Sequence, residues 1–191
     1  MEKERYDLTE SLLEWYDYNK RILPWRENKD PYRIWISEIM LQQTRVEAVK
    51  PYFDRFMEAL PEVEDLANVD DDRLMKLWEG LGYYNRARNL KAAANKIMKE
   101  YGGKIPGDYD ALLSLNGIGA YTAGAIGSIA FDLQVPAVDG NVMRVLARIW
   151  GDESDILKEK TKREMGKRIS AYIPKERPGD FNQALIELGA I

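Results

Sequence analysis

The amino-acid sequence predicts an all-α fold. Apolar residues recur close to the helical period of 3.6 residues through most of the chain. Proline, glycine and capping residues divide it into segments of ordinary helix length. No segment shows the strict apolar–polar alternation of a half-buried strand, and there is neither an internal repeat nor a low-complexity segment. We therefore expect packed helices joined by short connections.

Proline and aspartate residues mark the starts and ends of the predicted helices in the first half of the chain. Leu23-Pro24 breaks an initial helix, and Asp30-Pro31 is a strong restart with Asp at the N-cap and Pro in the first turn. Pro61 stops a later helix, and Asp70 is expected to cap another. The predicted helices span residues 6–19, 32–43, 46–60, 63–67, 71–79 and 89–101.

Residues 80–88 are predicted to form a loop, because two glycines precede a pair of adjacent tyrosines and two arginines. This mixture suits a surface where one side chain enters a base stack and bases lie on an aromatic ring. The alternative is a buried tyrosine pair with no contact to nucleic acid.

Residues 110–145 carry the most informative pattern. Two short helical segments flank the tight turn Leu115-Asn116-Gly117-Ile118-Gly119, where glycine accepts positive φ and lets another backbone approach closely. Gly119 opens the second helix, whose free N–H groups favour a phosphate oxygen. The turn is interpreted as a phosphate clamp for nucleic acid; alternatively, the glycines merely end one helix and start another.

A lone acid, Asp139, follows in an apolar strip just before a helix that runs to about Trp150. A lysine- and arginine-rich helix is expected to start at Ser154 or Asp155 and to end before Pro174. A final helix is expected over residues 181–188.

Composition limits the chemistry. The 191 residues include no cysteine and no histidine, so general acid–base work falls to carboxylates, tyrosine or lysine, and we expect no metal site. The net charge is −4, but residues 54–72 carry eight acidic side chains and one basic one, whereas residues 84–104 carry six bases and one acid. A segregated basic face of this kind is what phosphate contact requires, although two solvated faces would give the same pattern.

Glu38 is the second notable acid. It lies in the predicted helix 32–43 among apolar neighbours on nearly every helical face. A carboxyl group in such surroundings is favoured in its protonated form or needs a specific partner. The alternative is an ordinary exposed carboxylate.

Three stretches together resemble the helix-hairpin-helix base-excision glycosylases, most closely adenine DNA glycosylases of the MutY type. They are Ser37-Glu38-x-Met40-Leu41-Gln42-Gln43-Thr44, Leu115-Asn116-Gly117-Ile118-Gly119 with Tyr121-Thr122-Ala123, and Val138-Asp139-Gly140-Asn141-Val142-x-Arg144-Val145. The match runs from about Leu23 to the last residue. Asn116 departs from it, because the family usually has proline there.

The resemblance implies two helical lobes with an active-site cleft between them: a central lobe over residues 24–132, with the hairpin, and a second lobe over residues 1–23 plus 133–191. Cleavage of an N-glycosidic bond needs one acid to protonate the base and one anion to face the sugar cation. Glu38 is the better acid, and Asp139, at a helix N-terminus that favours negative charge, is the better anion. The family assigns them the same roles, with Asp139 stabilising the oxocarbenium ion or forming a transient sugar adduct. Tyr121 and Asn141 are expected to hydrogen-bond the catalytic groups.

The target base must leave the duplex to reach such a pocket. By resemblance, Gln43 and Tyr83 would fill the vacated stack, with Arg86, Gly117 and Gly119 as further DNA contacts. The residues expected to line the adenine pocket are Trp25, Arg26, Leu41 and Gln183.

Position 121 separates two activities. In bifunctional relatives resembling endonuclease III a lysine stands there and forms a Schiff base; Tyr121 cannot, so we expect a monofunctional enzyme. An endonuclease III-like lyase and a non-catalytic helix-hairpin-helix DNA-binding module remain alternatives. The expected function is excision of adenine mispaired with 8-oxoguanine or guanine.

Relatives continue past Leu188-Gly189-Ala190 with cysteines that hold a 4Fe–4S cluster, and then usually with a domain that reads 8-oxoguanine. This chain has neither, so we expect no cofactor in it and either a truncated core or a shortened member. The expected partner is double-stranded DNA with a mispaired adenine, bound by a monomer. No apolar run could span a membrane and no leader pattern is present, so we expect no membrane partner and a cytoplasmic, nucleoid-associated location.

Overall fold

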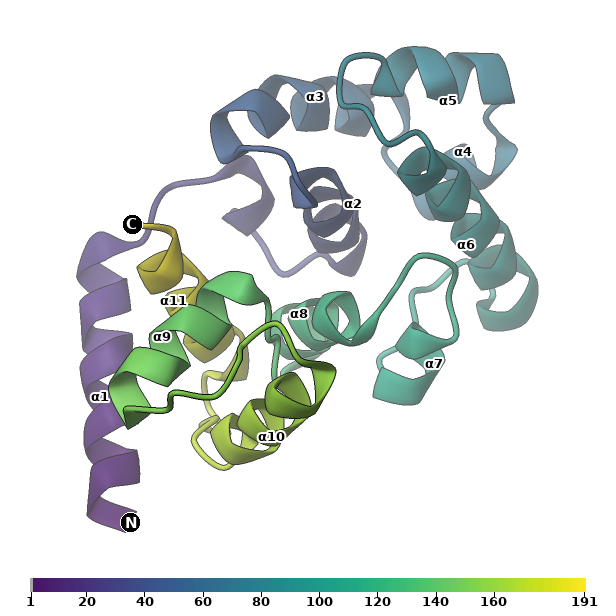
Figure 1. Ribbon diagram of the computed structural model, residues 1–191. Helices are drawn as coiled ribbons and strands as arrows, with labels where there is room; N and C mark the ends of the chain where they lie inside the picture. Colours follow the sequence, from purple (N-terminus) through teal and green to yellow (C-terminus); the bar gives the residue numbers. More distant parts are fainter. Residues whose placement is uncertain (1) are drawn as a thin grey trace. The chain divides into compact units, whose positions relative to one another are not determined.

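The computed structural model describes residues 2–191, with side chains from Leu8 onward, and every regular element within them is a helix (Figure 1). The predicted all-α fold is confirmed. The helices are α1 (Glu2–Asn19), η1 (Pro24–Arg26), α2 (Pro31–Leu41), α3 (Val46–Ala59), α4 (Val63–Asn68), α5 (Asp71–Trp78), α6 (Asn85–Tyr101), α7 (Tyr109–Leu113), α8 (Ala120–Phe131), α9 (Gly140–Trp150), α10 (Glu159–Ser170) and α11 (Pro178–Ala190).

Three helix starts differ from prediction by about one turn: α1 begins at Glu2 instead of residue 6, and the other two are α6 and α10. α6 begins at Asn85, so the end of the expected loop 80–88 is helical. α10 begins only at Glu159, because the two expected capping residues are used elsewhere. The Asp155 carboxylate accepts from the Leu157 backbone N–H in a two-residue turn, and the Ser154 N–H donates to the carboxylate of Asp152. Such local turns compete with helix initiation.

Residue contacts divide the chain into a central unit, Ile22–Thr122, and a terminal unit, Met1–Arg21 with Ala123–Ile191. The second boundary falls inside α8, whereas the resemblance placed it after residue 132. The two units are described separately below.

In the central unit, α2 is fixed at its beginning. The Asp30 carboxylate accepts from the Tyr32 backbone N–H at 2.9 Å, which confirms the predicted cap, and Pro31 is the first helical residue. The Tyr32 hydroxyl donates to the carbonyl of Leu60 at 2.9 Å. Burial raises the pKa of Tyr32, so this hydroxyl keeps its proton and its hydrogen bond. The helix that carries Glu38 therefore has a defined position against α3.

The core of the central unit is aromatic. The rings of Phe56 on α3 and Trp78 on α5 meet edge to face with centroids 6.1 Å apart, and both are fully buried. The long helix α6 packs on α4 and also contacts α2 and α5. This packing brings the first turn of α6 close to the end of α2, with consequences for the site.

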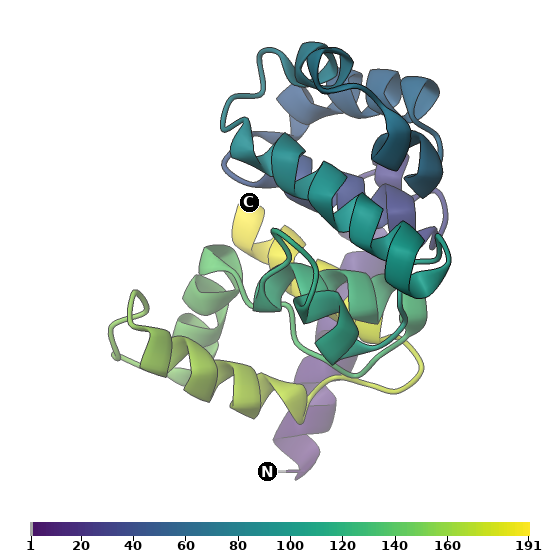
Figure 2. The ribbon, with the colours of Figure 1, turned by 90° about the vertical axis from the view of Figure 1, so that its right-hand side faces the viewer.

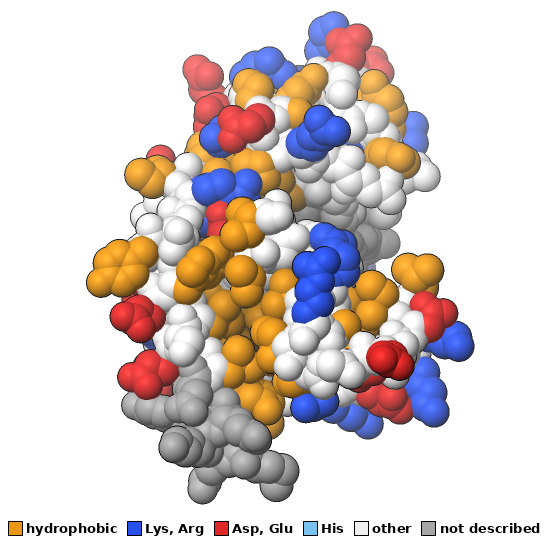
Figure 3. Space-filling view, turned by 60° about the vertical axis from the view of Figure 1, so that its left-hand side comes forward, with side chains coloured by type: hydrophobic (Ala, Val, Ile, Leu, Met, Phe, Trp, Pro, Cys, Tyr) orange, Lys and Arg blue, Asp and Glu red, His pale blue; other side chains and the backbone are white. Residues whose placement is uncertain are grey.

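In the terminal unit, α11 packs against both α1 and α9 (Figures 1 and 2). Its buried core joins residues of α9, such as Val142 and Leu146, to Phe181 and Leu185 of α11. Further hydrophobic side chains of this unit are only partly buried, and Figure 3 shows apolar side chains gathered there between acidic and basic ones. The start of α9, where Asp139 lies, is thus held by the core of this unit.

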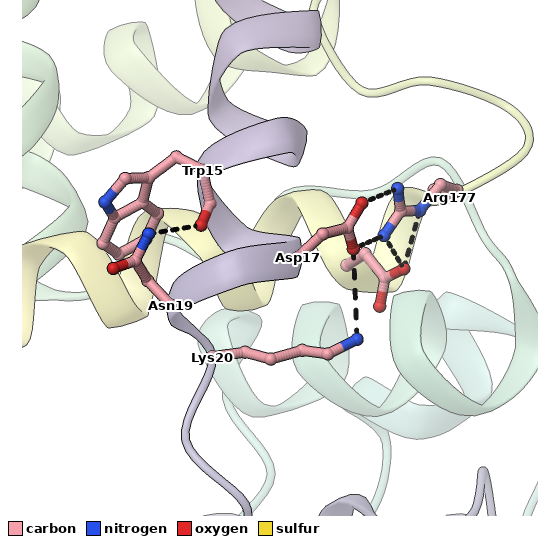
Figure 4. A network of polar contacts seen from close by, with 6 residues as sticks. Trp15, Asp17, Asn19, Lys20 and Arg177 are labelled. Carbon is pink, nitrogen blue, oxygen red and sulfur yellow. Dashed lines mark hydrogen bonds and ion pairs between the residues drawn. The ribbon is translucent and has the colours of Figure 1, made fainter.

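An ion-pair network fastens α1 to the start of α11 (Figure 4). The Arg177 guanidinium donates to both carboxylate oxygens of Asp17, at 2.9 and 2.6 Å, and to Asp180 at 2.8 Å. Lys20 adds a longer ion pair to Asp17 at 3.9 Å. The hydrogen bond from Arg177 lowers the pKa of Asp17, and the acidic partners raise the pKa of Arg177.

Candidate functional site

Asp139 caps α9, as its position before the predicted helix suggested. One carboxylate oxygen accepts from the Val142 backbone N–H at 2.8 Å, and the other accepts from the Asn141 side-chain amide at 3.2 Å. The residue is half-buried and its backbone is extended. Its carboxylate is thus held as an acceptor at the positive end of an 11-residue helix.

Arg144 completes this arrangement, and sequence reasoning assigned it no role. Its guanidinium donates to the Asn141 side-chain oxygen at 2.5 Å and to two backbone carbonyls, Gly140 at 3.3 Å and Gly189 at 3.2 Å. The spacing of three residues between Asn141 and Arg144 on one helix face is the signal that would have found the first of these contacts. The contact with Gly189 has no local signal.

Glu38 lies near the end of α2 and is half-buried. Its helical neighbours are as apolar as predicted: Trp35, Ile36, Ile39 and Met40 are all buried, with Trp35 1% exposed. A partly exposed carboxyl group on an otherwise buried helix can exchange a proton with a bound molecule while its neighbours exclude most water.

The hairpin consists of α7, the turn 114–119 and α8, with half-buried Tyr121 in the first turn of α8. Gly117 has a φ of +76°, and a Cβ there would lie 2.8 Å from the Cβ of Asn89 on α6, so both backbone and space require glycine. Gly119 lacks a positive φ, and a Cβ there would meet nothing within 4 Å. The sequence therefore predicted the need for glycine correctly at Gly117, whereas Gly119 is open to the outside.

Two lysines of α6 form hydrogen bonds or ion pairs with other residues of the central unit. Lys96 donates to the carbonyl and hydroxyl oxygens of Ser114 in the hairpin turn, at 2.9 and 3.1 Å. Lys91 pairs with Asp71 of the acidic segment at 2.5 Å. The basic stretch 84–104 is therefore not wholly available to an external phosphate, although Arg88, Lys99 and Lys104 are exposed.

A surface cleft of about 560 Å³ lies beside α6 in the central unit. Gln43 and Tyr83, the two residues expected to enter a base stack, both line it. Tyr83 is 65% exposed and Tyr84 39% exposed, so the buried tyrosine pair is wrong. The cleft is lined by Gln42, Gln43, Tyr83, Tyr84, Asn85, Arg86, Arg88 and Asn89.

The backbone at this cleft is strained at both stack-filling candidates. Gln43 has a φ of +58° and Tyr83 a φ of +48°, a left-handed conformation that costs a non-glycine residue roughly 1–2 kcal/mol. Such conformations persist only where the surroundings enforce them, and they cluster at functional sites.

Arg86 enforces this geometry from inside. It is 9% exposed, and its guanidinium faces backbone carbonyls instead of the DNA contact that the sequence suggested. The reason is the early start of α6, which puts Arg86 on a helical turn that faces the end of α2. Burial lowers the pKa of Arg86, whose ordinary value lies far above neutral, so it stays charged. The carbonyls that accept from it within 3.2 Å belong to Ile39, Met40, Gln42, Leu81 and Gly82.

The four expected pocket residues are distributed unevenly. Trp25 is buried with its ring edge-to-face on Phe53, at a centroid distance of 5.4 Å, so most of its surface belongs to the core. Arg26 and Leu41 are half-buried at the ends of η1 and α2 in the central unit. Gln183 is half-buried on α11 of the terminal unit.

Residues 36–171 match the family model described as HhH-GPD superfamily base excision DNA repair protein. The chain belongs to the HhH-GPD superfamily. The matched range includes the hairpin, Glu38 and Asp139, so the resemblance seen in the sequence is confirmed at the family level.

Individual HhH-GPD relatives extend this match. The chain is 44% identical over 189 residues to a mouse (Mus musculus) protein named adenine DNA glycosylase, covering 94% of this chain and 37% of the mouse protein. It is 40% identical to the adenine DNA glycosylase of Buchnera aphidicola, covering 97% of this chain and 53% of that protein. A solved thermostable thymine-DNA glycosylase superimposes with a TM-score of 0.90 and 30% identity, covering 100% of this chain and 88% of the other.

The chain thus spans between about a third and a half of the length of the curated HhH-GPD relatives it matches. Its sequence contains no cysteine, so these residues offer no thiolate for an iron–sulfur cluster. Among the described residues, no group of three or more carboxylates is placed to hold a metal ion. None of the described helices has the apolar length that crossing a bilayer requires.

Proposed function

We propose that the chain is a monofunctional adenine DNA glycosylase that removes adenine mispaired with 8-oxoguanine or guanine from duplex DNA. One observation carries the proposal: a chain 44% identical to a protein named adenine DNA glycosylase holds Asp139 as a hydrogen-bonded helix cap. The same chain supplies Glu38, Tyr121 and Asn141 at the positions that the resemblance assigns to catalysis.

The hairpin would bind the DNA backbone. The turn before α8 is exposed at Gly119, where no side chain hinders the approach of a phosphate to the helix N-terminus. Gln43 and Tyr83 would occupy the space that the flipped adenine leaves, because both are exposed on the cleft of the central unit.

The reaction needs both carboxyl groups at one nucleotide. Protonated Glu38 gives its proton to a ring nitrogen of adenine, the N-glycosidic bond breaks, and its electron pair leaves with the base. The Asp139 carboxylate stabilises the positive charge that develops on the sugar. Water then adds to the anomeric carbon, and its proton returns to the Glu38 carboxylate, which restores the starting state.

Tyr121 limits the reaction to hydrolysis. A lyase forms a Schiff base between an amine and the sugar, and a phenol cannot form one. The product is therefore an abasic site in an intact strand.

The decisive experiment is incubation with duplex DNA containing adenine opposite 8-oxoguanine under single-turnover conditions. We expect strand breaks only after alkali treatment. We expect none in a control duplex that carries thymine in place of adenine opposite 8-oxoguanine. Breaks without alkali, together with borohydride trapping of a protein–DNA adduct, would establish the lyase alternative. Tight binding with no base release would leave only the binding module.

DNA binding by the hairpin has its own test. Counterion release predicts that affinity falls steeply between about 50 and 200 mM salt. Gly119→Val should weaken binding while leaving the thermal unfolding temperature unchanged, because a side chain there meets open space. Full affinity in this variant would contradict the phosphate clamp.

A further inference from the structure

The hairpin turn lies along one face of α6. Asn89 and Lys96 both meet the turn, and a separation of seven residues, about two helical turns or 10 Å, places them on the same face of the helix. A Cβ at Gly117 would lie 2.8 Å from the Cβ of Asn89, so the turn and the helix are in close contact there. Lys96 holds the other end of the turn, at Ser114.

Lys96 supplies a hydrogen-bond donor to the end of α7. Ser114 follows the last helical residue, and carbonyls at a helix end have no partner within the helix. The Lys96 ammonium donates to the Ser114 carbonyl at 2.9 Å and to the Ser114 hydroxyl oxygen at 3.1 Å. The hydroxyl gives its own proton to the carbonyl of Ala111 at 2.7 Å, so its oxygen accepts from Lys96.

The charge of Lys96 is engaged within the central unit. Its side chain is 27% exposed, and a third acceptor, the Glu100 carboxylate, lies 3.8 Å away. An ammonium has three protons, so Lys96 is matched in number to acceptors of its own chain. Lys91, on the same helix, is 24% exposed and pairs with Asp71 of α5. The two lysines therefore have the same charge and similar burial, but only Lys96 contacts the hairpin turn.

The helix that holds the turn also borders the surface cleft. Asn89 lines this cleft together with Gln43 and Tyr83, the two residues proposed to enter the base stack. The turn and the cleft are thus both attached to α6 inside the central unit. A turn released from α6 would have to be ordered again when DNA binds, and such ordering lowers affinity.

We infer that Lys96 is a positioning residue, which anchors the hairpin turn to α6 and keeps the phosphate clamp in its DNA-binding conformation. Lys96 acts through Ser114 and touches neither the phosphate nor the reacting atoms. The inference rests on the proposed function for its effect on affinity, whereas the anchoring of the turn can be measured without DNA.

The first test is the affinity for a duplex with a mispaired adenine, measured over a range of salt concentrations. Lys96→Met should weaken binding about 3- to 10-fold, because part of the binding energy is spent on ordering the turn. The slope of log affinity against log salt concentration should stay within about 0.3 of the parental slope, whereas loss of a direct phosphate contact changes it by about 0.9. The maximal single-turnover rate should stay within about twofold of the parent.

Two further variants identify the route of the effect. Lys91→Met, the matched control, removes the same charge and should bind within about twofold of the parent. In Gly119→Val the clamp is already blocked, so adding Lys96→Met should change affinity less than about twofold.

Four outcomes of these measurements would overturn the inference. Parental affinity in Lys96→Met would show that the anchor is not needed. A slope changed by about 0.9 would make Lys96 a phosphate contact. An equal loss in Lys91→Met would show that total charge alone matters. An undiminished loss in the Gly119→Val background would show that Lys96 acts outside the clamp.

The second test is backbone hydrogen exchange in the absence of DNA. The N–H groups of Leu115 and Ile118 donate to carbonyls within the hairpin, at 3.1 and 3.2 Å. In Lys96→Met they should exchange at least about threefold faster, while exchange in α4, which also packs on α6, stays parental. Parental exchange in the turn refutes the inference, and faster exchange in both segments would show a general loss of stability instead. If the parent protein binds no DNA, the proposed function fails, and this measurement still decides whether Lys96 anchors the turn.

Discussion

Replacing Arg86 by methionine should destabilise the central unit strongly. Methionine fills much of the same space but donates no hydrogen bond, so five backbone carbonyls at the end of α2 and in the loop before α6 lose a charged donor. A hydrogen bond to a charged group contributes about 1.5–3 kcal/mol, and carbonyls near the surface regain water. We therefore expect the free energy of unfolding to fall by about 3–5 kcal/mol, equivalent to roughly two fully lost bonds.

Fluorescence-monitored urea unfolding is the appropriate measurement, because three of the five tryptophans, Trp25, Trp35 and Trp78, lie in the central unit. The matched control is Arg88→Met, two residues further along α6. Arg88 is exposed, and its guanidinium donates to the Asn85 side chain at 3.0 Å. Its replacement should cost no more than about 0.5 kcal/mol, as is usual for surface positions.

A cost of less than about 1 kcal/mol for Arg86→Met, or a cost no greater than that of the control, would show that these hydrogen bonds do not stabilise the central unit. If Arg86→Met does not fold, Arg86→Lys provides the same comparison. Lysine keeps one charge but cannot reach carbonyls on both segments, so it should fall between the parent and the methionine variant. Arg86→Met should also loosen the strained backbone at Gln43 and Tyr83, the two residues proposed to fill the base stack. If a fluorescent base is placed next to the mispaired adenine, its change in fluorescence on protein binding should therefore be smaller with this variant.

Five further substitutions have defined outcomes. Asp17→Asn should lower the free energy of unfolding by less than about 1 kcal/mol, because the ion pair with Arg177 is largely exposed. Folding lowers the pKa of Asp17, so this loss is present at neutral pH and disappears as the pH falls through the folded-state pKa. Equal losses at pH 7 and near pH 2.5 in urea unfolding would contradict this pH dependence. Gly117→Ala should cost about 1–3 kcal/mol because of its positive φ and the asparagine of α6 beside it, while Gly119→Ala should be nearly neutral in thermal unfolding. Glu38→Gln and Asp139→Asn should each slow adenine release by about 10²–10⁴-fold while duplex affinity, measured in parallel, is retained; a near-parental rate in either variant would refute its catalytic role.

Features set by residues close in sequence were predictable. Asp30 and Asp70 each accept a backbone N–H within three residues of themselves, so their caps could be recognised from the residue types alone. The helix from Gly140 to Trp150 follows from one cap and one apolar stripe, and its predicted end is confirmed. The need for glycine at Gly117 followed from the tightness of the turn.

Errors arose where two local signals competed. Asp155 is a good helix cap, yet it bonds to Leu157 in a turn, and α10 starts later than expected. The arginines after Tyr84 were assigned to a basic loop, because glycines and tyrosines precede them. The chain is already helical from Asn85, and this change of direction turns Arg86 inward. Propensity alone cannot decide such cases, because packing of α6 on α4 and α2 selects the outcome.

The contacts around the proposed catalytic residues fall into two classes by their separation along the sequence. Asp139 is held by Val142 and Asn141, only three and two residues away. Its outer support comes from Arg144, which reaches 45 positions to Gly189, and the end of α2 beyond Glu38 is held by Arg86, 47 positions from Ile39. Both distant supports are arginines that donate to helix-terminal carbonyls, and a flexible, multiply donating cation suits this task because it satisfies several acceptors at once. Replacing either arginine by lysine would preserve the charge of the sequence but leave some of these carbonyls without a donor, so sequence similarity at these positions is a poor guide to function.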